Sequence, residues 1–320
     1  MRLNFQAISL YGNTTPETID GGGQKYAFRN ETGTGSATVY SVFPGIDLIY
    51  NEIHMSYCSH HQQVSGRVIE INYCQQGRSE CGFGNRTFGY MGPGDLAFCT
   101  LQRISHEASF PLYHYHGITI TVDFDQVTKE TEALFDSLFI DLTQIGKLFD
   151  KRDFFILRAN ERIEHIFSEL YAIDDAKREG YLKLKTLELL LVLTYFNPGM
   201  ERRKYLSKSQ TDLVRNVQAQ MTDNPKHHFT IDELAKAHGV SPTHLKNCFR
   251  CVYGTSIYAY MRVYRLHLAA RLLTNTDKQV AEIASLIGFE NPNKFSSAFR
   301  SEFGISPTQF RKSVLLDRFV

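Results

Sequence analysis

Two spacings of apolar residues divide the N-terminal part of the chain. Between residues 40 and 125, short β-branched and aromatic segments alternate with Gly or Pro turns, as in IDLIYNEI, RVIEINYC, SECGF, DLAFCTL and GITITVDF. Many short strands without intervening helices predict a β-sandwich or barrel. The sequence GPGD at 92–95 predicts a tight hairpin between its flanking strands, and the Gly- and Thr-rich residues 12–36 predict a mobile arm or loop.

From Gln126 the apolar residues recur every three or four positions, the spacing of amphipathic helices, in EALFDSLFIDL, ERIEHIFSELYAI and YLKLKTLELLLVLTYF. The last segment is apolar on two faces, with Leu189 on one and Leu187 on the other. Two apolar faces need two partners, so this helix is either buried in a core or shared with a second subunit. The charged residues 201–210 follow an Asn-Pro-Gly break and predict an interdomain linker.

The strongest organisational signal is an internal duplication near the C-terminus. Residues 231–260 align with residues 280–310. Each copy predicts a short helix, a turn at a glycine that can take positive φ, and a second helix that opens with proline. This order of elements is that of a helix-turn-helix unit. The paired positions include Ala235 with Ala284, Gly239 with Gly288, Ser241 with Asn291 and Pro242 with Pro292.

The second helix of each copy, about residues 242–253 and 292–303, has one apolar and one polar face. Hydroxyl, amide and cationic groups read base edges in a major groove, and arginine holds phosphate. Any surface helix shows polar residues outward, but here a helix at 257–276, about 30 Å long, joins two copies. That length suits two reading helices one DNA turn apart, ~34 Å. The outward residues are Thr243, His244, Lys246, Asn247, Arg250, Asn293, Lys294, Ser296, Ser297 and Arg300.

Charge is distributed unevenly along the chain, although the total is close to neutral at +1. Residues 200–320 hold 18 Lys and Arg against 10 Asp and Glu, whereas residues 1–199 hold 17 against 24. A basic half of this kind favours a polyanionic partner. Six cysteines without an N-terminal signal region predict reduced thiols in the cytoplasm. The longest apolar stretch, residues 187–196, is too short to span a membrane.

The motifs TIDELAKAHGVSPTHLKNCFR, YGTSIYAYMRVYRLHLAARLL and VAEIASLIGFENPNKFSSAFRSEFGISPTQFRK carry a family resemblance. The stretch 229–312 resembles the DNA-binding domain of the AraC/XylS family of bacterial transcription regulators. The resemblance implies two helix-turn-helix subdomains bridged by a long helix, with recognition by the second helix of each. Position by position it implies base contacts from Thr243, Lys246, Asn247, Asn293, Ser296 and Ser297, and we expect phosphate contacts from Arg250, Lys294 and Arg300.

The same resemblance implies a β-sandwich or cupin-like sensor ahead of the DNA-binding part. Its candidate effector-binding residues are Tyr73, Arg78 and Glu80, on strands expected to line the sandwich interior, with a solvated hairpin as the alternative. His114 and His116 lie on one side of a strand, a spacing that can chelate metal. The next residues supply no carboxylate, so we predict no metal and treat both histidines as effector-contacting or partly buried groups.

We therefore expect an α+β multidomain fold. A cupin-like β-sandwich sensor with an N-terminal arm would occupy 1–125, a helical dimerisation region 126–199, a linker 200–210 and an all-α double helix-turn-helix domain 211–320. The expected function is sequence-specific transcription regulation, with activation favoured, by a homodimer that binds duplex DNA and a small-molecule effector. RNA polymerase is a possible partner, and we expect no cofactor, membrane association or enzymatic activity. The alternatives are a regulator without an effector, or a metal-dependent cupin enzyme fused to a DNA-binding tail.

Overall fold

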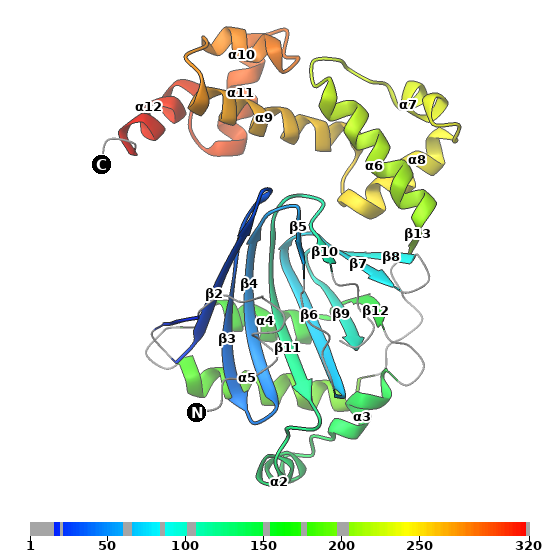
Figure 1. Ribbon diagram of the computed structural model, residues 1–320, viewed down its shortest axis with the longest axis vertical. Coiled ribbons are helices and arrows are strands. Elements are labelled where there is room, and N and C mark those ends of the chain that lie inside the picture. The colour runs from blue at the N-terminus through cyan, green and yellow to red at the C-terminus, as the bar shows by residue number, and fades with distance from the viewer. Residues whose placement is uncertain are drawn as a thin grey trace. The chain divides into compact units, whose positions relative to one another are not determined.

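The chain divides into two compact units, unit 1 at Met1–Lys208 and unit 2 at Ser209–Val320 (Figure 1). The computed structural model describes residues 16–19, 22–59, 66–83, 87–100, 107–149, 154–173, 178–196 and 205–317. The first residues of the predicted arm and of the predicted linker therefore lie outside the described residues. The predicted fold class, a sheet-rich N-terminal region followed by a helical helix-turn-helix region, is confirmed.

Unit 1 is built on two antiparallel sheets. The large sheet has the strand order β1-β2-β3-β4-β11-β6-β9-β12, and the small sheet has the order β13-β8-β7-β10-β5. The strands are β1 (Glu17–Thr18), β2 (Gln24–Asn30), β3 (Gly33–Phe43), β4 (Ile46–His54), β5 (Tyr57–Ser59), β6 (Val68–Gly77), β7 (Ser79–Phe83), β8 (Thr87–Met91), β9 (Asp95–Thr100), β10 (Glu107–Ser109), β11 (Tyr115–Asp123), β12 (Phe154–Arg158) and β13 (Leu206–Ser207).

The two faces of the large sheet pack against different partners, because successive side chains of a strand point to opposite faces. On one face, Leu48 and Ile120 join a core that includes Phe167 and Leu189 of the helices lying across the sheet (Figure 1). On the other face, which we call the inner face, Ile53 and other buried residues pack with residues of the small sheet. The helices of unit 1 are α2 (Lys129–Ser137), α3 (Leu142–Lys147), α4 (Glu161–Tyr171) and α5 (Arg178–Thr194).

The turn at 92–95 does not form the predicted hairpin. It is tight, since the Asp95 amide donates to Gly92 O at 2.9 Å. However, β8 pairs with β7 and β13 in the small sheet, whereas β9 pairs with β6 and β12 in the large sheet. The turn therefore carries the chain from one sheet to the other. The turn itself does not determine the partners of β8 and β9, which include strands distant in sequence.

Residues 24–36 are also not the predicted loop, because β2 and β3 form a hairpin at one end of the large sheet. The glycines there permit close packing. A Cβ on Gly33 would collide with His54 O, and a Cβ on Gly35 would collide with the Phe28 ring. The glycine content that indicated a loop instead reflects contacts that leave no room for a side chain.

Two further segments differ from the helical region and linker predicted between 126 and 210. Residues 154–158 form β12, which pairs with β9 along its whole length. Leu206 and Ser207 form β13, which pairs with β8, and the next helix begins at Lys208. Short apolar runs such as FFILR carry no periodicity that separates a buried strand from a helix, so their sheet partner decides their structure.

Unit 2 is helical and is organised around the long helix α9. Its residues Leu266, Ala269 and Leu273 pack in one core with Phe295 and Phe299 of the second duplicated segment. No helix among the described residues has the length and apolarity to cross a membrane. The helices are α6 (Lys208–Asp223), α7 (Ile231–Ala237), α8 (Pro242–Tyr253), α9 (Ile257–Asn275), α10 (Val280–Leu286), α11 (Pro292–Phe303) and α12 (Pro307–Asp317).

Candidate nucleic-acid interface

The first helix-turn-helix consists of α7 and α8. A capping box starts α7, because Thr230 Oγ1 accepts from the Glu233 amide while the Glu233 carboxylate accepts from the Thr230 amide. Gly239 turns the chain with φ +66°. Helix α8 then begins at Pro242, with Ser241 Oγ accepting from the His244 amide at 3.2 Å.

The second unit repeats this construction with α10 and α11. Gly288 has φ +87° in the turn. Asn291 Oδ1 caps α11 by accepting from the amides of Asn293 and Lys294, at 2.8 and 3.2 Å. Both second helices end at a left-handed glycine, Gly254 after α8 and Gly304 after α11. Their bounds therefore follow from local signals at both ends and coincide with the predicted reading helices.

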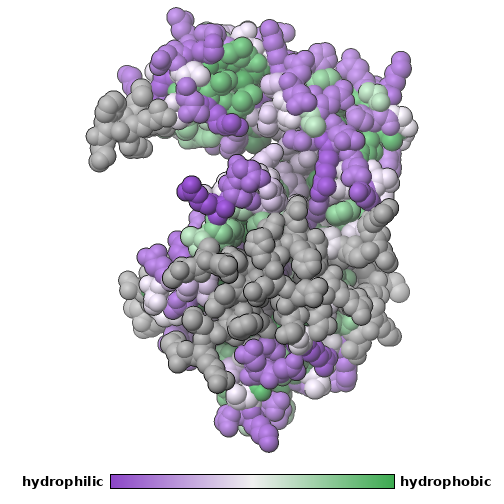
Figure 2. Space-filling model, in the orientation of Figure 1, coloured by the Kyte–Doolittle hydropathy of each residue, from purple (hydrophilic) through white to green (hydrophobic). Residues whose placement is uncertain are grey.

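Each second helix buries its apolar face and exposes its polar face. Leu245, Phe249, Phe295 and Phe299 are fully buried. The predicted DNA-contacting residues are exposed, apart from the half-buried Ser296, and hydrophilic residues predominate on the face of unit 2 seen in Figure 2. This arrangement supplies two separate polar surfaces. They comprise Thr243, Lys246, Asn247 and Arg250 on α8, and Asn293, Lys294, Ser296, Ser297 and Arg300 on α11.

A buried arginine links the long helix to the segment before α7. Arg265 Nε donates to Pro225 O at 2.7 Å, and its Nη2 donates to His227 O at 3.0 Å. The neighbouring His228 places Nε2 2.8 Å from Gly288 O, in the second helix-turn-helix. Arg265 therefore serves packing within unit 2, whereas Arg262 on the same helix is exposed. Burial lowers the pKa of the Arg265 guanidinium.

The predicted effector-binding set in unit 1 is not gathered in one place. Tyr73 stacks on Phe167 of α4, with ring centroids 4.3 Å apart, so its side chain lies in the helix-side core and not on the inner face. Glu80 is buried in the small sheet, where its carboxylate accepts from Tyr90 OH at 2.6 Å. Arg78 is half-buried, and its guanidinium lies beside Gly92. Side-chain alternation on β6 explains the error for Tyr73, since its neighbours Asn72 and Cys74 face the other way.

The inner face of the large sheet carries polar side chains that were not among the predicted site residues. Asn51 Nδ2 donates to Thr119 Oγ1 at 2.9 Å, and Tyr115 OH donates to Asn72 Oδ1 at 2.5 Å. Burial raises the pKa of the Glu70 carboxyl to about 7, while its hydrogen bond with Asn72 acts in the opposite direction. The signal was present in VIEINYC, where Glu and Asn alternate with isoleucines that belong to the helix-side core.

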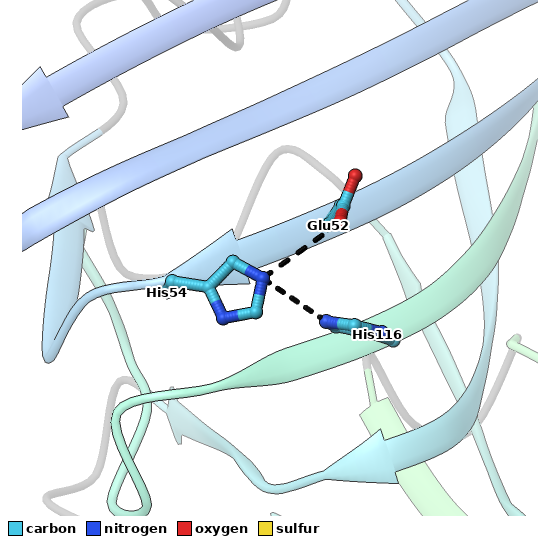
Figure 3. Close-up of side chains that lie close together, drawn as sticks. All are labelled: Glu52, His54 and His116. Carbon is cyan, nitrogen blue, oxygen red and sulfur yellow. Dashed lines mark hydrogen bonds and ion pairs between the residues drawn. The ribbon is translucent and has the colours of Figure 1, made fainter. Parts of the chain in front are cut away.

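His114 and His116 do not form the chelating pair that their spacing allowed. His114 Nδ1 lies 3.3 Å from Leu112 O, and the ring centroids of His114 and His116 are 6.3 Å apart. The ring centroids of His116 and His54 are closer, at 5.0 Å. His116 instead faces His54 of β4, with Nε2 atoms 3.3 Å apart, and His54 Nε2 lies 3.8 Å from Glu52 Oε1 (Figure 3). Partial burial, then the neighbouring His54, lowers the pKa of His116. The carboxylate absent after His116 in sequence is therefore supplied by the adjacent strand.

Comparison with known proteins finds relatives of the helix-turn-helix part of the chain. Residues 234–313 match the family model described as a helix-turn-helix domain. The HTH-type transcriptional regulator MtrA of Neisseria gonorrhoeae is 26% identical over 165 residues, 49% of this chain and 55% of MtrA. The HTH-type transcriptional activator AarP of Providencia stuartii is 29% identical over 104 residues, 32% of this chain and 77% of AarP. A solved transcriptional regulator with an AraC-type DNA-binding domain, from Chromobacterium violaceum, is 28% identical over 33% of this chain and 95% of its own, with a TM-score of 0.32.

The chain spans about half the length of MtrA. The matched residues 234–313 contain the end of α7 and all of α8, α9, α10 and α11. The C-terminal part of the chain therefore carries a helix-turn-helix domain of the AraC type, similar to those of bacterial transcription regulators.

Proposed function

We propose that the protein is a sequence-specific transcription regulator whose helices α8 and α11 enter successive major grooves of duplex DNA. The observation that carries this proposal is the pair of exposed polar helix faces built on one scaffold and joined by the 19-residue α9. A helix of that length extends about 28 Å, close to the ~34 Å between successive major grooves on one side of the duplex.

Within this proposal the exposed residues divide into two roles. Thr243, Lys246 and Asn247 lie in the first turns of α8 and carry the donors and acceptors that read base edges. Arg250 lies one turn further along the same face and holds phosphate. On α11, Asn293, Ser296 and Ser297 contact bases, and Lys294 and Arg300 contact the phosphate backbone of the DNA.

Fluorescence anisotropy with a DNA fragment that the protein selects from a random pool tests these roles. Lys246→Ala should lose preference for the selected site over random DNA, by about 1–3 kcal/mol. Arg250→Ala should weaken binding to both DNAs and reduce the salt slope by about one. Lys129→Ala in α2, an exposed cation of unit 1, is the matched control for loss of one charge. If Lys246→Ala and Arg250→Ala both bind like the control, the assigned reading face is wrong.

We further propose that unit 1 is the sensor and binds a small-molecule effector among the polar groups of the inner face. Glu70, Asn72, Asn51 and Thr119 supply both donors and acceptors there, beside apolar residues such as Ile53 and Ala97. This set replaces Tyr73 as a ligand-contacting residue. A metabolite screen by thermal shift, repeated on Asn72→Leu, tests the site: a hit that stabilises both proteins equally would place the effector elsewhere.

We also propose a cytoplasmic homodimer that activates transcription with RNA polymerase and catalyses no reaction. The outer face of α5 supports the dimer, since Leu184 is 63% exposed there, while Leu187 and Leu191 are half-buried. An exposed leucine on a helix whose other face lies in a core favours a second subunit as partner. Analytical ultracentrifugation should show a dimer for the wild type and a monomer for Leu184→Glu; a dimer in both would move the interface away from α5.

A further inference from the structure

Glu52, His54 and His116 bring three potential ligand atoms together (Figure 3). By alternation along β4 and β11, they lie on the same face of the large sheet as Leu48 and Ile120, the face that the helices cover. Glu52 and His116 are directly opposed partners of β4 and β11, so their side chains share a face. His54 lies two residues beyond Glu52 on the same face. The Nε2 atoms of the two histidines are 3.3 Å apart, His54 Nε2 is 3.8 Å from Glu52 Oε1, and all three ligand atoms lie within 4.8 Å of one another.

These separations fit a common metal ion. Bonds of about 2.0–2.2 Å to imidazole nitrogen and carboxylate oxygen place neighbouring ligands of a tetrahedral or octahedral ion roughly 3–3.5 Å apart. Small side-chain rotations would bring the Glu52 carboxylate, whose nearer oxygen is 3.8 Å from His54 Nε2, into that range. At 3.3 Å, the two facing imidazole nitrogens already have the separation expected of neighbouring ligands of one ion.

The cluster lies where the cover of the sheet by α4 ends. The preceding residue of β4 on this face, Tyr50, donates from OH to Leu170 O near the end of α4, at 2.7 Å. Beyond it, the side chains of Glu52 and His54 are 61% and 53% exposed. An ion therefore has direct access from solvent. The cluster is also separate from the polar groups of the inner face, because residues 52 and 54 alternate with Asn51 and Ile53 along β4.

We propose that the protein binds one divalent first-row transition-metal ion through Glu52 Oε1, His54 Nε2 and His116 Nε2. Two imidazoles and one carboxylate suit Zn²⁺ and its neighbours better than Mg²⁺ or Ca²⁺, which prefer oxygen ligands. Three protein ligands leave the remaining positions to water or to a small anion. The ion cross-links β4 and β11 and is independent of the DNA-binding role of unit 2.

Titration of the full-length protein with Zn²⁺, against a chromophoric chelator of known affinity, tests this site. We expect one equivalent to bind, and the affinity to fall at least about tenfold in His54→Ala, His116→Ala and Glu52→Gln, since loss of even an outer partner costs that much. His114→Ala is the matched control, because this histidine lies beside the cluster with its Nδ1 near Leu112 O, and it should bind like the wild type.

Two outcomes would overturn the proposal. One is Zn²⁺ binding that is absent in the wild type or equally strong in His116→Ala. The other is a cobalt complex with an intense thiolate charge-transfer absorption, which would place the ion at a cysteine such as Cys251 in the C-x-x-C of α8. Circular dichroism of each variant separates loss of ligation from loss of folding, and retained metal binding by folded variants contradicts the assignment.

Discussion

Replacing Arg265 with methionine should loosen unit 2 without touching either reading face. The side chain is 7% exposed, and methionine keeps its length and most of its apolar contacts. What the change removes is a set of guanidinium hydrogen bonds: to Pro225 O at 2.7 Å, to His227 O at 3.0 Å and to His228 Nδ1 at 3.3 Å. The backbone before α7 then loses its attachment to the middle of α9.

The magnitude follows from the two shorter bonds. A hydrogen bond from a charged donor contributes about 1.5–3 kcal/mol, so the two bonds to carbonyl oxygens together contribute about 3–6 kcal/mol to the unfolding free energy. Arg265→Lys keeps the charge and can still make one of the two hydrogen bonds, so we expect the unfolding free energy to fall by about half as much as in Arg265→Met. Because His228 also contacts Gly288 O, the loosened segment should transmit disorder to the turn before α11.

Hydrogen exchange read by mass spectrometry isolates this effect from the unfolding of unit 1. Amides of α7 and α9 should exchange with a local opening free energy lower by about 3 kcal/mol in Arg265→Met, and by less in Arg265→Lys. DNA binding should weaken more for a two-groove site than for a single half-site, since the two reading helices lose their fixed spacing. Unchanged exchange in α7 and α9 would show that the guanidinium contacts do not hold unit 2 together.

Two further predictions concern the Glu70 carboxyl and the two glycines of the paired turns. The pKa of Glu70 is raised from 4.5 to about 7, so between these pH values the folded protein holds a proton that the unfolded chain has released. The unfolding free energy therefore falls by about 3 kcal/mol as the pH rises from about 4.5 to about 7. Glu70→Gln should flatten this fall in thermal denaturation, and equal pH dependence in both proteins would refute the assignment. Gly288→Ala should lower the melting temperature more than Gly239→Ala. Both glycines have positive φ, but only at Gly288 would a Cβ lie 2.9 Å from a backbone oxygen, that of Lys226. A larger decrease in melting temperature for Gly239→Ala would contradict this packing.

The helix-turn-helix elements were predictable because their signals are local. Proline after a capping residue fixes the first residue of α8 and of α11, and the left-handed glycines that follow them fix the last. The duplication supplied each signal twice. The inward and outward faces followed from the spacing of Leu245, Phe249, Phe295 and Phe299, all of which are fully buried.

The sheets of unit 1 were less predictable because strand partners are not encoded locally. The turn at 92–95 is compatible with a hairpin and with a crossing between sheets, and only the pairing of β9 with β6 and β12 decides. In the sequence, glycine at position 33 indicates flexibility, whereas in the fold the carbonyl oxygen of His54 lies so close that a side chain is excluded. The cluster of Glu52, His54 and His116 joins residues 62 positions apart, so no spacing within one strand could reveal all three.

Hydroxyl-radical footprinting on a selected DNA site tests the central claim most directly. With the wild type, we predict two protected segments on one face of the duplex, centred about one helical turn apart, ~10 base pairs. A variant with Lys294→Ala and Arg300→Ala on α11 should lose one segment and keep the other. A single protected segment with the wild type, or two segments on opposite faces of the duplex, would contradict the insertion of α8 and α11 into successive major grooves.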